Sequence, residues 1–322
     1  MAETNTQGST KASERRILSL DGGGSKGVYT LGVLKEIEAM APDPLHECFD
    51  LIYGTSTGAI IATLLACGES VDFIREKYFQ LIPDIMGNNT AKERTKSLLK
   101  HGEEIFGERD FEDCLTCLGI VGVRCDHFRP IIFKNTDFIA QGRKATFLPG
   151  FGAPLAQAVV SSCSAYPFFE KFLVNTKKEG DVLVIDGGFV ANDPTLFALT
   201  DAIRALGSSP SSTTVLSIGT GDYPAPQPSY WDNLKKRFVT QFFDIELTET
   251  IMRTNANTLE LLRGFLMEET TCIRINERFN LAEYQTTFLE NEAQKLENMF
   301  NLGSNSLSKD DNERRIRDAF GW

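Results

Sequence analysis

The sequence predicts an α/β fold, a three-layer sandwich in which a central, mostly parallel sheet is flanked by helices. Two segments, 16–40 and 51–66, each combine an apolar strand, a glycine-containing turn and a helix. Two more apolar strands, within 182–188 and 214–221, also end in glycines. Apolar strands alternating with helices are typical of parallel sheets, because crossover helices bury both faces of each strand.

Length and charge limit the organisation and the partners. The 322 residues, 42% of them hydrophobic, can bury a large core. We expect residues 1–15 to form a polar, disordered arm, 16–225 the α/β core, and 226–322 a helical extension packed on that core. The formal net charge of −11 argues against a broad nucleic-acid surface, so no DNA or RNA duplex is expected as partner.

The chain is expected to be cytoplasmic. Its first 14 residues are polar and do not resemble a secretory signal. It contains no apolar run of about 18 residues, the length expected of a membrane span. The seven cysteines are an odd number without disulfide-framework spacing, which favours free thiols in a reducing compartment.

A candidate nucleophile lies at the end of the second strand. Gly54 and Gly58 flank Ser56 as G-x-S-x-G, the pattern of a sharp strand-to-helix turn that exposes a serine. Glycines fit where the chain crowds itself at such a turn. The following helix directs its N-terminal N–H groups toward the serine.

The first strand leads into a second glycine-rich turn, which has three interpretations. Gly22, Gly24 and Gly27 satisfy the dinucleotide-binding pattern G-x-G-x-x-G, but no convincing strand ends in an acidic residue at the required distance. A P-loop lacks its Gly-Lys-Ser/Thr. An oxyanion hole, with backbone N–H groups facing a tetrahedral intermediate, is favoured because Ser56 follows one strand later.

Ser56 needs a base. The common order of serine, acid and histidine is excluded, because the histidines at 46, 101 and 127 all precede Asp186. Asp186 ends the apolar strand 182–186, at the sheet edge where α/β proteins place functional groups. The sequence therefore favours a Ser56–Asp186 dyad, with Asp186 in an apolar pocket that raises its proton affinity.

Two further patterns have competing interpretations. A zinc site could use Cys114, Cys117, Cys125 and His127, but a predicted helix over 112–118 and strand over 121–126 favour core thiols, so no metal or other cofactor is predicted. Within 228–250, an apolar stripe indicates either a helix packed on the sheet or a patch that meets lipid. That stripe consists of Trp231, Leu234, Phe238, Phe242 and Ile245.

Together these motifs resemble the patatin-like phospholipase family over about residues 15–225. The glycine turn after Asp21, the serine turn and the strand end at Asp186 are similar to three of its blocks. Asn192-Asp193-Pro194 resembles its Asn-Asn-Pro with one change, and Tyr166 replaces a smaller residue or proline.

The resemblance implies metal-free hydrolysis of fatty-acyl esters in membrane phospholipids, with membrane contact during turnover. It makes Ser56 the nucleophile and Asp186 the base. Gly22, Gly23 and Gly24 would then line the oxyanion hole. The supporting motif positions are Asp21, Lys26, Gly27, Gly54, Gly58, Gly187 and Gly188.

A narrower resemblance is to the patatin-like effectors of bacterial anti-phage defence, which implies activation by a cyclic dinucleotide. The basic clusters at 92–100 and 235–237 are the candidates for contacting that activator. A homo-oligomer is also considered. The alternative from another class is a nucleotide-binding module that uses the Gly22–Gly27 loop, in which Asp186 would be dispensable.

Overall fold

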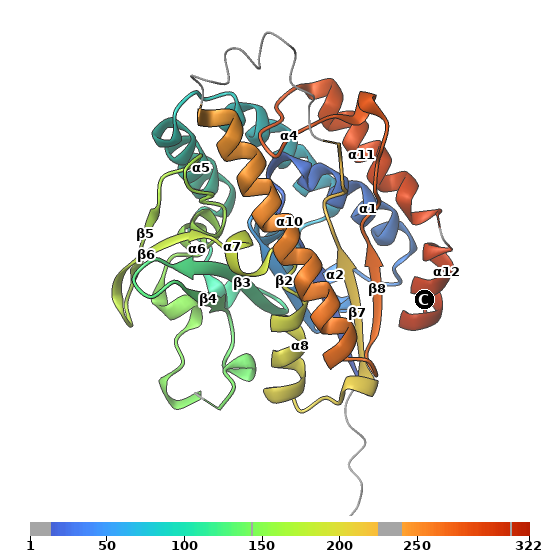
Figure 1. The fold of residues 1–322 in the computed structure, drawn as a ribbon. Coiled ribbons are helices and arrows are strands. Elements are labelled where there is room, and N and C mark those ends of the chain that lie inside the picture. The colour runs from blue at the N-terminus through green and yellow to red at the C-terminus, as the bar shows by residue number, and fades with distance from the viewer. Residues whose placement is uncertain (1–13, 143, 225–239, 310) are drawn as a thin grey trace, which may run out of the picture.

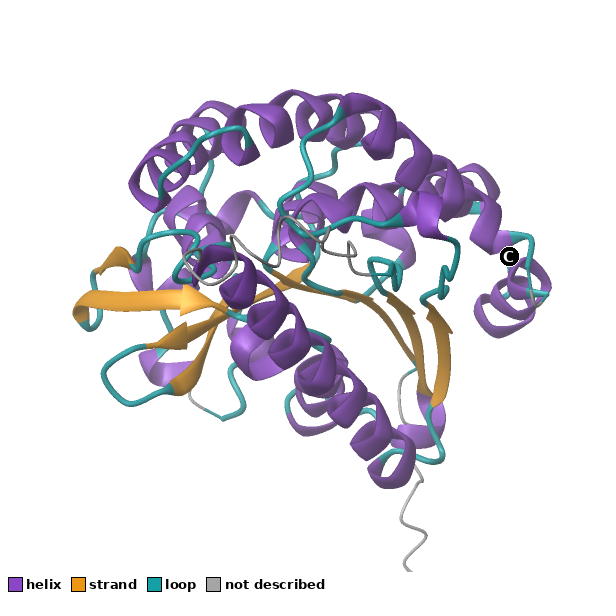
Figure 2. Ribbon diagram, turned by 45° about the horizontal axis from the view of Figure 1, so that its top comes forward, coloured by secondary structure: helices purple, strands orange, loops and turns teal. Residues whose placement is uncertain are grey.

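The computed structural model describes residues 14–142, 144–224, 240–309 and 311–322. A central sheet has helices on both sides, which confirms the predicted fold class (Figures 1 and 2). Its eight strands follow the order β5-β6-β3-β2-β1-β7-β8, and β4 pairs with β3. The strands are β1 (Arg15–Leu20), β2 (Leu51–Thr55), β3 (Cys117–Arg124), β4 (Arg129–Lys134), β5 (Phe172–Thr176), β6 (Gly180–Asp186), β7 (Thr213–Ile218) and β8 (Thr271–Ile275).

The parallel part of the sheet runs from β3 to β8, and β4, β5 and β6 are antiparallel additions at the β3 side. Helices connect and cover the strands. They are α1 (Gly27–Met40), α2 (Leu45–Cys48), α3 (Thr57–Ala66), α4 (Val71–Met86), α5 (Ala91–Phe106), α6 (Leu155–Ser162), α7 (Gly188–Ala191), α8 (Thr195–Arg204), α10 (Thr240–Leu266), α11 (Ala293–Leu307) and α12 (Asn312–Phe320).

Alternating residues of the central strands enter two cores. Leu18 and Leu216 belong to the large core that includes α1, α3 and α4. Their neighbours Ile17 and Val215 belong to a smaller core beneath α8. Strands buried on both faces read as continuous apolar runs, which is why the sequence revealed them.

The pairing register of β2, β3 and β6 brings Ser56 close to Asp186. One edge of β3 pairs with β4 over residues 119–124. The other edge is therefore shared, by β2 over residues 117–121 and by β6 over residues 122–124. On that edge Val121 pairs with Thr55, and the next residue, Gly122, pairs with Asp186. The end of β6 therefore meets the end of β2, where Ser56 begins the turn.

One secondary-structure prediction was wrong. The helix expected over 112–118 is a single 3-10 turn, and β3 begins at Cys117, because its apolar residues are buried in the sheet. The start of α5 is fixed by the Thr90–Glu93 capping box. Most of the apolar stripe within 228–250 lies outside the described residues.

Candidate active site

The turn after β2 has the geometry of a nucleophile elbow. Ser56 has φ 52° and ψ −124°, a left-handed conformation that is strained for a residue with a side chain. A Cβ at Gly54 would lie 2.3 Å from the carbonyl oxygen of Gly58, and one at Gly58 would lie 2.3 Å from that of Leu20. Only glycine fits either position, so the two glycines allow the strained turn.

Ser56 and Asp186 are in direct contact. The Ser56 hydroxyl donates a hydrogen bond of 2.6 Å to Oδ2 of Asp186, and the backbone N–H of Gly188 donates one of 2.7 Å to Oδ1. Both residues are buried. Burial raises the pKa of Asp186 to about 7, although the hydrogen bonds from Ser56 and Gly188 act to lower it. A carboxyl group with that pKa can exchange protons near neutral pH.

The histidines do not contribute to this contact. His46 lies next to Glu47, His101 binds Asp84, and His127 lies beside Asp126. None of the three lines the pocket above Ser56. Asp186 is the carboxylate that the Ser56 hydroxyl reaches.

Ser162, which the sequence did not indicate as a site residue, supports the turn. Its hydroxyl accepts a hydrogen bond of 2.9 Å from the backbone N–H of Ser56 and donates one of 2.6 Å to the carbonyl oxygen of Val121. The side chain thus connects the strained residue to β3. Gly187 lies close to the same strand, because a Cβ there would be 2.2 Å from the Val121 oxygen.

The glycine loop after β1 is held by Asn192. The N–H of Gly22 donates to the carbonyl oxygen of Asn192 at 3.0 Å, and Nδ2 of Asn192 donates back to the Gly22 oxygen at 3.1 Å. Within the described part of the chain, no intramolecular acceptor is found for the N–H groups of Gly23 and Gly24. These two donors remain available to a ligand in the pocket.

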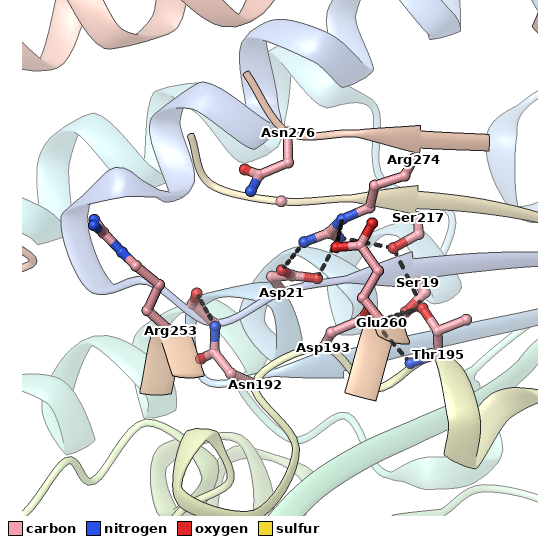
Figure 3. Close-up of polar contacts among 12 residues, drawn as sticks. Ser19, Asp21, Asn192, Asp193, Thr195, Ser217, Arg253, Glu260, Arg274 and Asn276 are labelled. Carbon is pink, nitrogen blue, oxygen red and sulfur yellow. Dashed lines mark hydrogen bonds and ion pairs between the residues drawn. The ribbon is translucent and has the colours of Figure 1, made fainter. Parts of the chain in front are cut away.

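A largely buried ionic cluster connects Asp21, at the start of the loop, to β7 and β8 (Figure 3). Arg274 of β8 donates two hydrogen bonds to Asp21, of 2.8 Å and 2.6 Å, and a third to Ser217. Burial raises the pKa of Asp21 to about 7, against the opposing effect of Arg274. Asp193 is also buried and accepts a hydrogen bond of 2.9 Å from the N–H of Thr195. Asp21 therefore anchors the loop rather than facing the pocket as a free acid.

The loop is covered from above by the C-terminal part of the chain. The buried Lys26 forms an ion pair of 2.7 Å with the partly buried Glu249 of α10, and the same oxygen of Glu249 accepts the N–H of Phe288 at 2.8 Å. The carbonyl oxygen of Phe288 accepts the N–H of Ser25 at 3.0 Å. This arrangement weakens the dinucleotide-binding interpretation, because the N–H of Ser25 is occupied. Gly27 lies against Thr57, where a Cβ would be 2.4 Å from Oγ1.

A pocket opens at Ser56, Asp186 and the glycines, and its lining combines apolar and polar side chains. The apolar ones include Ile60, Leu81, Ile85, Leu98, Phe169 and Phe288. The polar ones include Asn192, Thr220, Asp222, Arg253, Asn257 and Asn276.

The metal alternative finds no support in the described residues, which contain no group of three or more His, Cys, Asp or Glu side chains arranged to hold an ion. Cys114 instead lies 4.0 Å, sulfur to sulfur, from Cys67. Among the described helices, none combines the length and the apolar character needed to cross a bilayer.

The fold and the paired Ser56 and Asp186 define an α/β protein with its candidate nucleophile on a strand-to-helix turn. The family model of patatin-like phospholipases matches residues 18–199. The chain belongs to the patatin-like phospholipase family.

Two curated relatives and one solved structure describe the similarity further. The chain is 44% identical to the cUMP-AMP-activated phospholipase of Escherichia coli, covering 91% of this chain and 90% of the relative. It is 29% identical to the cGAMP-activated phospholipase of E. coli strain TW11681, covering 64% and 62%. VipD from Legionella pneumophila shares the fold, with a TM-score of 0.51 at 12% identity, over 95% of this chain and 67% of VipD.

Proposed function

We propose that the chain is a lipid acyl hydrolase that cleaves fatty-acyl esters of membrane phospholipids through Ser56 and Asp186. The observation that carries the proposal is the 2.6 Å hydrogen bond between these two buried side chains at a strained strand-to-helix turn. Membership of the patatin-like phospholipase family supports the substrate class.

In the proposed first half-reaction, Asp186 accepts the proton of the Ser56 hydroxyl as Oγ attacks the ester carbonyl carbon. Negative charge develops on the carbonyl oxygen. The N–H groups of Gly23 and Gly24 are suited to stabilise it, because they are not committed to other acceptors. Gly22 has a positioning role, since its N–H is bonded to Asn192. The tetrahedral intermediate collapses, and Asp186 returns the proton to the departing lyso-lipid oxygen.

In the second half-reaction water is the nucleophile and Ser56 is the leaving group. A water molecule attacks the acyl-Ser56 ester while Asp186 accepts one of its protons. Collapse of the second tetrahedral intermediate releases the fatty acid, and the proton returns to Oγ of Ser56. A single carboxyl group with a pKa near 7 can both accept and return the proton at neutral pH.

The mixed lining of the pocket supports an amphiphilic substrate. An acyl chain would contact the apolar residues, which include Leu81, Ile85 and Phe288, and the head group would contact the polar ones.

We also propose that a cyclic dinucleotide switches the enzyme on, as part of anti-phage defence. The support is the similarity to two relatives named for activation by cUMP-AMP and cGAMP, one of them at 44% identity over nearly the whole chain. We place the enzyme in the cytoplasm, with membrane contact during turnover. The seven free cysteines suit a reducing compartment.

Hydrolysis of a fluorogenic phospholipid by the wild type, Ser56→Ala and Asp186→Asn tests the dyad. Each assay is run without nucleotide, with cUMP-AMP and with cGAMP. Asp181→Asn is the matched control, because Asp181 lies on the same strand but is exposed. We expect both dyad variants to lose at least about a thousandfold in activity and the control to retain it. Activity that survives Ser56→Ala would overturn the mechanism.

The assays with and without nucleotide test the proposed activation separately from the catalytic mechanism. Activity that needs cUMP-AMP or cGAMP supports the proposed activation, and equal activity in all arms argues against it. A wild type that binds a nucleotide but never hydrolyses lipid, with binding unchanged in Asp186→Asn, would favour the nucleotide-binding module.

A further inference from the structure

The outward side of α10 carries a regular, uncharged stripe. Figures 1 and 2 show this helix lying across the outside of the molecule. Ala256, at its middle, is buried against the protein. The residues that face away from the protein follow one another at steps of four, three, four, three and four. We call them the α10 seam: Leu247, Ile251, Thr254, Thr258, Leu261 and Phe265, all exposed.

A solvent-facing helix side normally carries charged residues. Thr250, Asn255 and Asn257, which flank the seam, are also uncharged, and Leu262 and Leu266 extend its apolar end. Phe265 is 74% exposed and Leu261 is 61% exposed. From such exposed fractions the apolar side chains present roughly 600 Å² to solvent, the upper end of what a monomer usually leaves bare. This face is therefore suited to a partner.

The spacing of the seam indicates a helical partner. The five steps average 3.6 residues, the period of the helix itself, so the seam runs along one side of α10, where a second helix can pack. The seam is also symmetric about Ala256. Leu247 and Phe265 are equally far from it on opposite sides, and so are Ile251 and Leu261, and Thr254 and Thr258.

We propose that the partner is a second copy of this chain, whose α10 packs antiparallel on the first about a two-fold axis near Ala256. Leu247 of each copy would then meet Phe265 of the other, and Ile251 would meet Leu261. The threonines would meet at the centre. Such a pair would bury about 1,200 Å², within the range of specific dimers, and the antiparallel arrangement opposes the two helix dipoles favourably.

Charge favours a second copy over a lipid surface. Interfacial helices usually flank their apolar face with Lys and Arg, and the flanks of the α10 seam lack both. α10 also lines the pocket, through residues that include Met252 and Ala256, so pairing would hold one wall of each pocket in place.

A charge-exchange experiment tests the pairing in the full chain. Sedimentation velocity and light scattering measure the dimer dissociation constant of the wild type, Ile251→Glu, Leu261→Lys and the double variant. Each single variant places an unpaired charge against an apolar residue, and we expect its dissociation constant to rise at least about a hundredfold. In the double variant, the carboxylate at position 251 of each copy meets the ammonium group at position 261 of the other copy. Both contacts then pair opposite charges, so the dissociation constant should fall back toward that of the wild type.

The double variant distinguishes the geometries, because residues 251 and 261 are about 15 Å apart along one helix and do not contact each other. A parallel pairing would set like charges together, and failure of the double variant to restore the dimer would overturn the antiparallel arrangement. Leu173→Glu is the control, since Leu173 is an exposed apolar residue on β5, outside the α10 seam. It should leave the dimer intact.

A wild type that is monomeric at all concentrations, with or without the two cyclic dinucleotides, would overturn the proposal. Co-sedimentation with phosphatidylglycerol vesicles tests the lipid alternative. Vesicle binding by a monomeric wild type that Ile251→Glu abolishes would assign the seam to lipid instead. The variants replace exposed residues, and thermal unfolding checks that each remains folded.

Discussion

Arg274 and Asp21 connect the C-terminal part of the chain to the loop that carries the two available N–H groups. The side chain of Asp21 is buried and that of Arg274 is 14% exposed, and the guanidinium contacts both carboxylate oxygens, at 2.8 Å and 2.6 Å. The arrangement is a fork-to-fork pair, the strongest geometry for these two groups. The position of Gly22 to Gly24 therefore depends on a residue in the last strand of the sheet.

Replacing Arg274 by Met should lower the free energy of unfolding by about 3–5 kcal/mol, because it leaves Asp21 as an unpaired buried carboxylate. Urea unfolding followed by circular dichroism measures the loss. The double variant Arg274→Met with Asp21→Asn should recover part of it, because no charge is then left without a partner. Losses that simply add in the double variant would contradict the pairing as the cause.

The activity should depend on pH through Asp186. Its carboxylate must be unprotonated to accept the Ser56 proton, and burial raises its pKa to about 7. We expect kcat/KM for a fluorogenic phospholipid to increase tenfold per pH unit below about 7 and to level off above it. A profile that is flat between pH 5 and 8 would exclude Asp186 as the base.

The same pKa predicts how stability changes with pH. A carboxyl group whose pKa is raised on folding binds protons more tightly in the folded state, so its contribution to stability is lost as pH increases through about 7. Asp186→Asn removes this loss. The variant should therefore be more stable than the wild type by about 4 kcal/mol at pH 8, and by only about 1–2 kcal/mol at pH 5. Thermal unfolding at the two pH values measures both differences.

Ser162 and Ser161 are neighbours that allow a matched comparison. Both are fully buried, but Ser161 donates only within its own helix, to Ala158, whereas Ser162 connects Ser56 to Val121. Ser162→Ala should reduce kcat about tenfold or more, because the strained turn loses its support. Ser161→Ala should change kcat less than about twofold. Equal effects would show that the connection to Ser56 does not matter.

Glu249 holds α10 and the segment around Phe288 to the glycine loop. Glu249→Gln should lower the free energy of unfolding by about 2–3 kcal/mol, because Lys26 is left as a buried cation without its partner. Glu246→Gln is the control, since Glu246 lies exposed on the same helix. Urea unfolding compares the two, and similar losses would contradict a specific role of the ion pair.

The sequence predicted the fold and the Ser56–Asp186 pair because both depend on local patterns at strand ends. Parallel strands buried on two faces read as apolar runs, and functional groups gather at their carboxyl ends. The two residues are 130 positions apart, yet each has its own signal: a glycine-flanked turn and an acid followed by glycines. That the two side chains are in contact follows only from the pairing register of β2, β3 and β6, which the sequence does not show.

Other parts of the site could not be predicted, because they depend on long-range packing. Arg274 is 253 positions from Asp21, and an arginine in a short strand has no pattern that reveals its partner. Ser162 reads as one of several small residues in a helix. The helix wrongly expected over 112–118 followed the spacing of Cys114, Leu115 and Leu118, which a 3-10 turn entering a strand also satisfies.

The covering of the glycine loop by Glu249, Phe288 and Arg274 has a consequence for any shortened form of this protein. The family match ends at residue 199, and a fragment cut at 225 would keep Ser56 and Asp186. It would nevertheless lose β8, expose the edge of β7 and leave Asp21 and Lys26 without counter-ions. Removal of the segment after residue 225 should therefore inactivate the protein although both reacting side chains remain, and residues 16–225 alone should not have its activity.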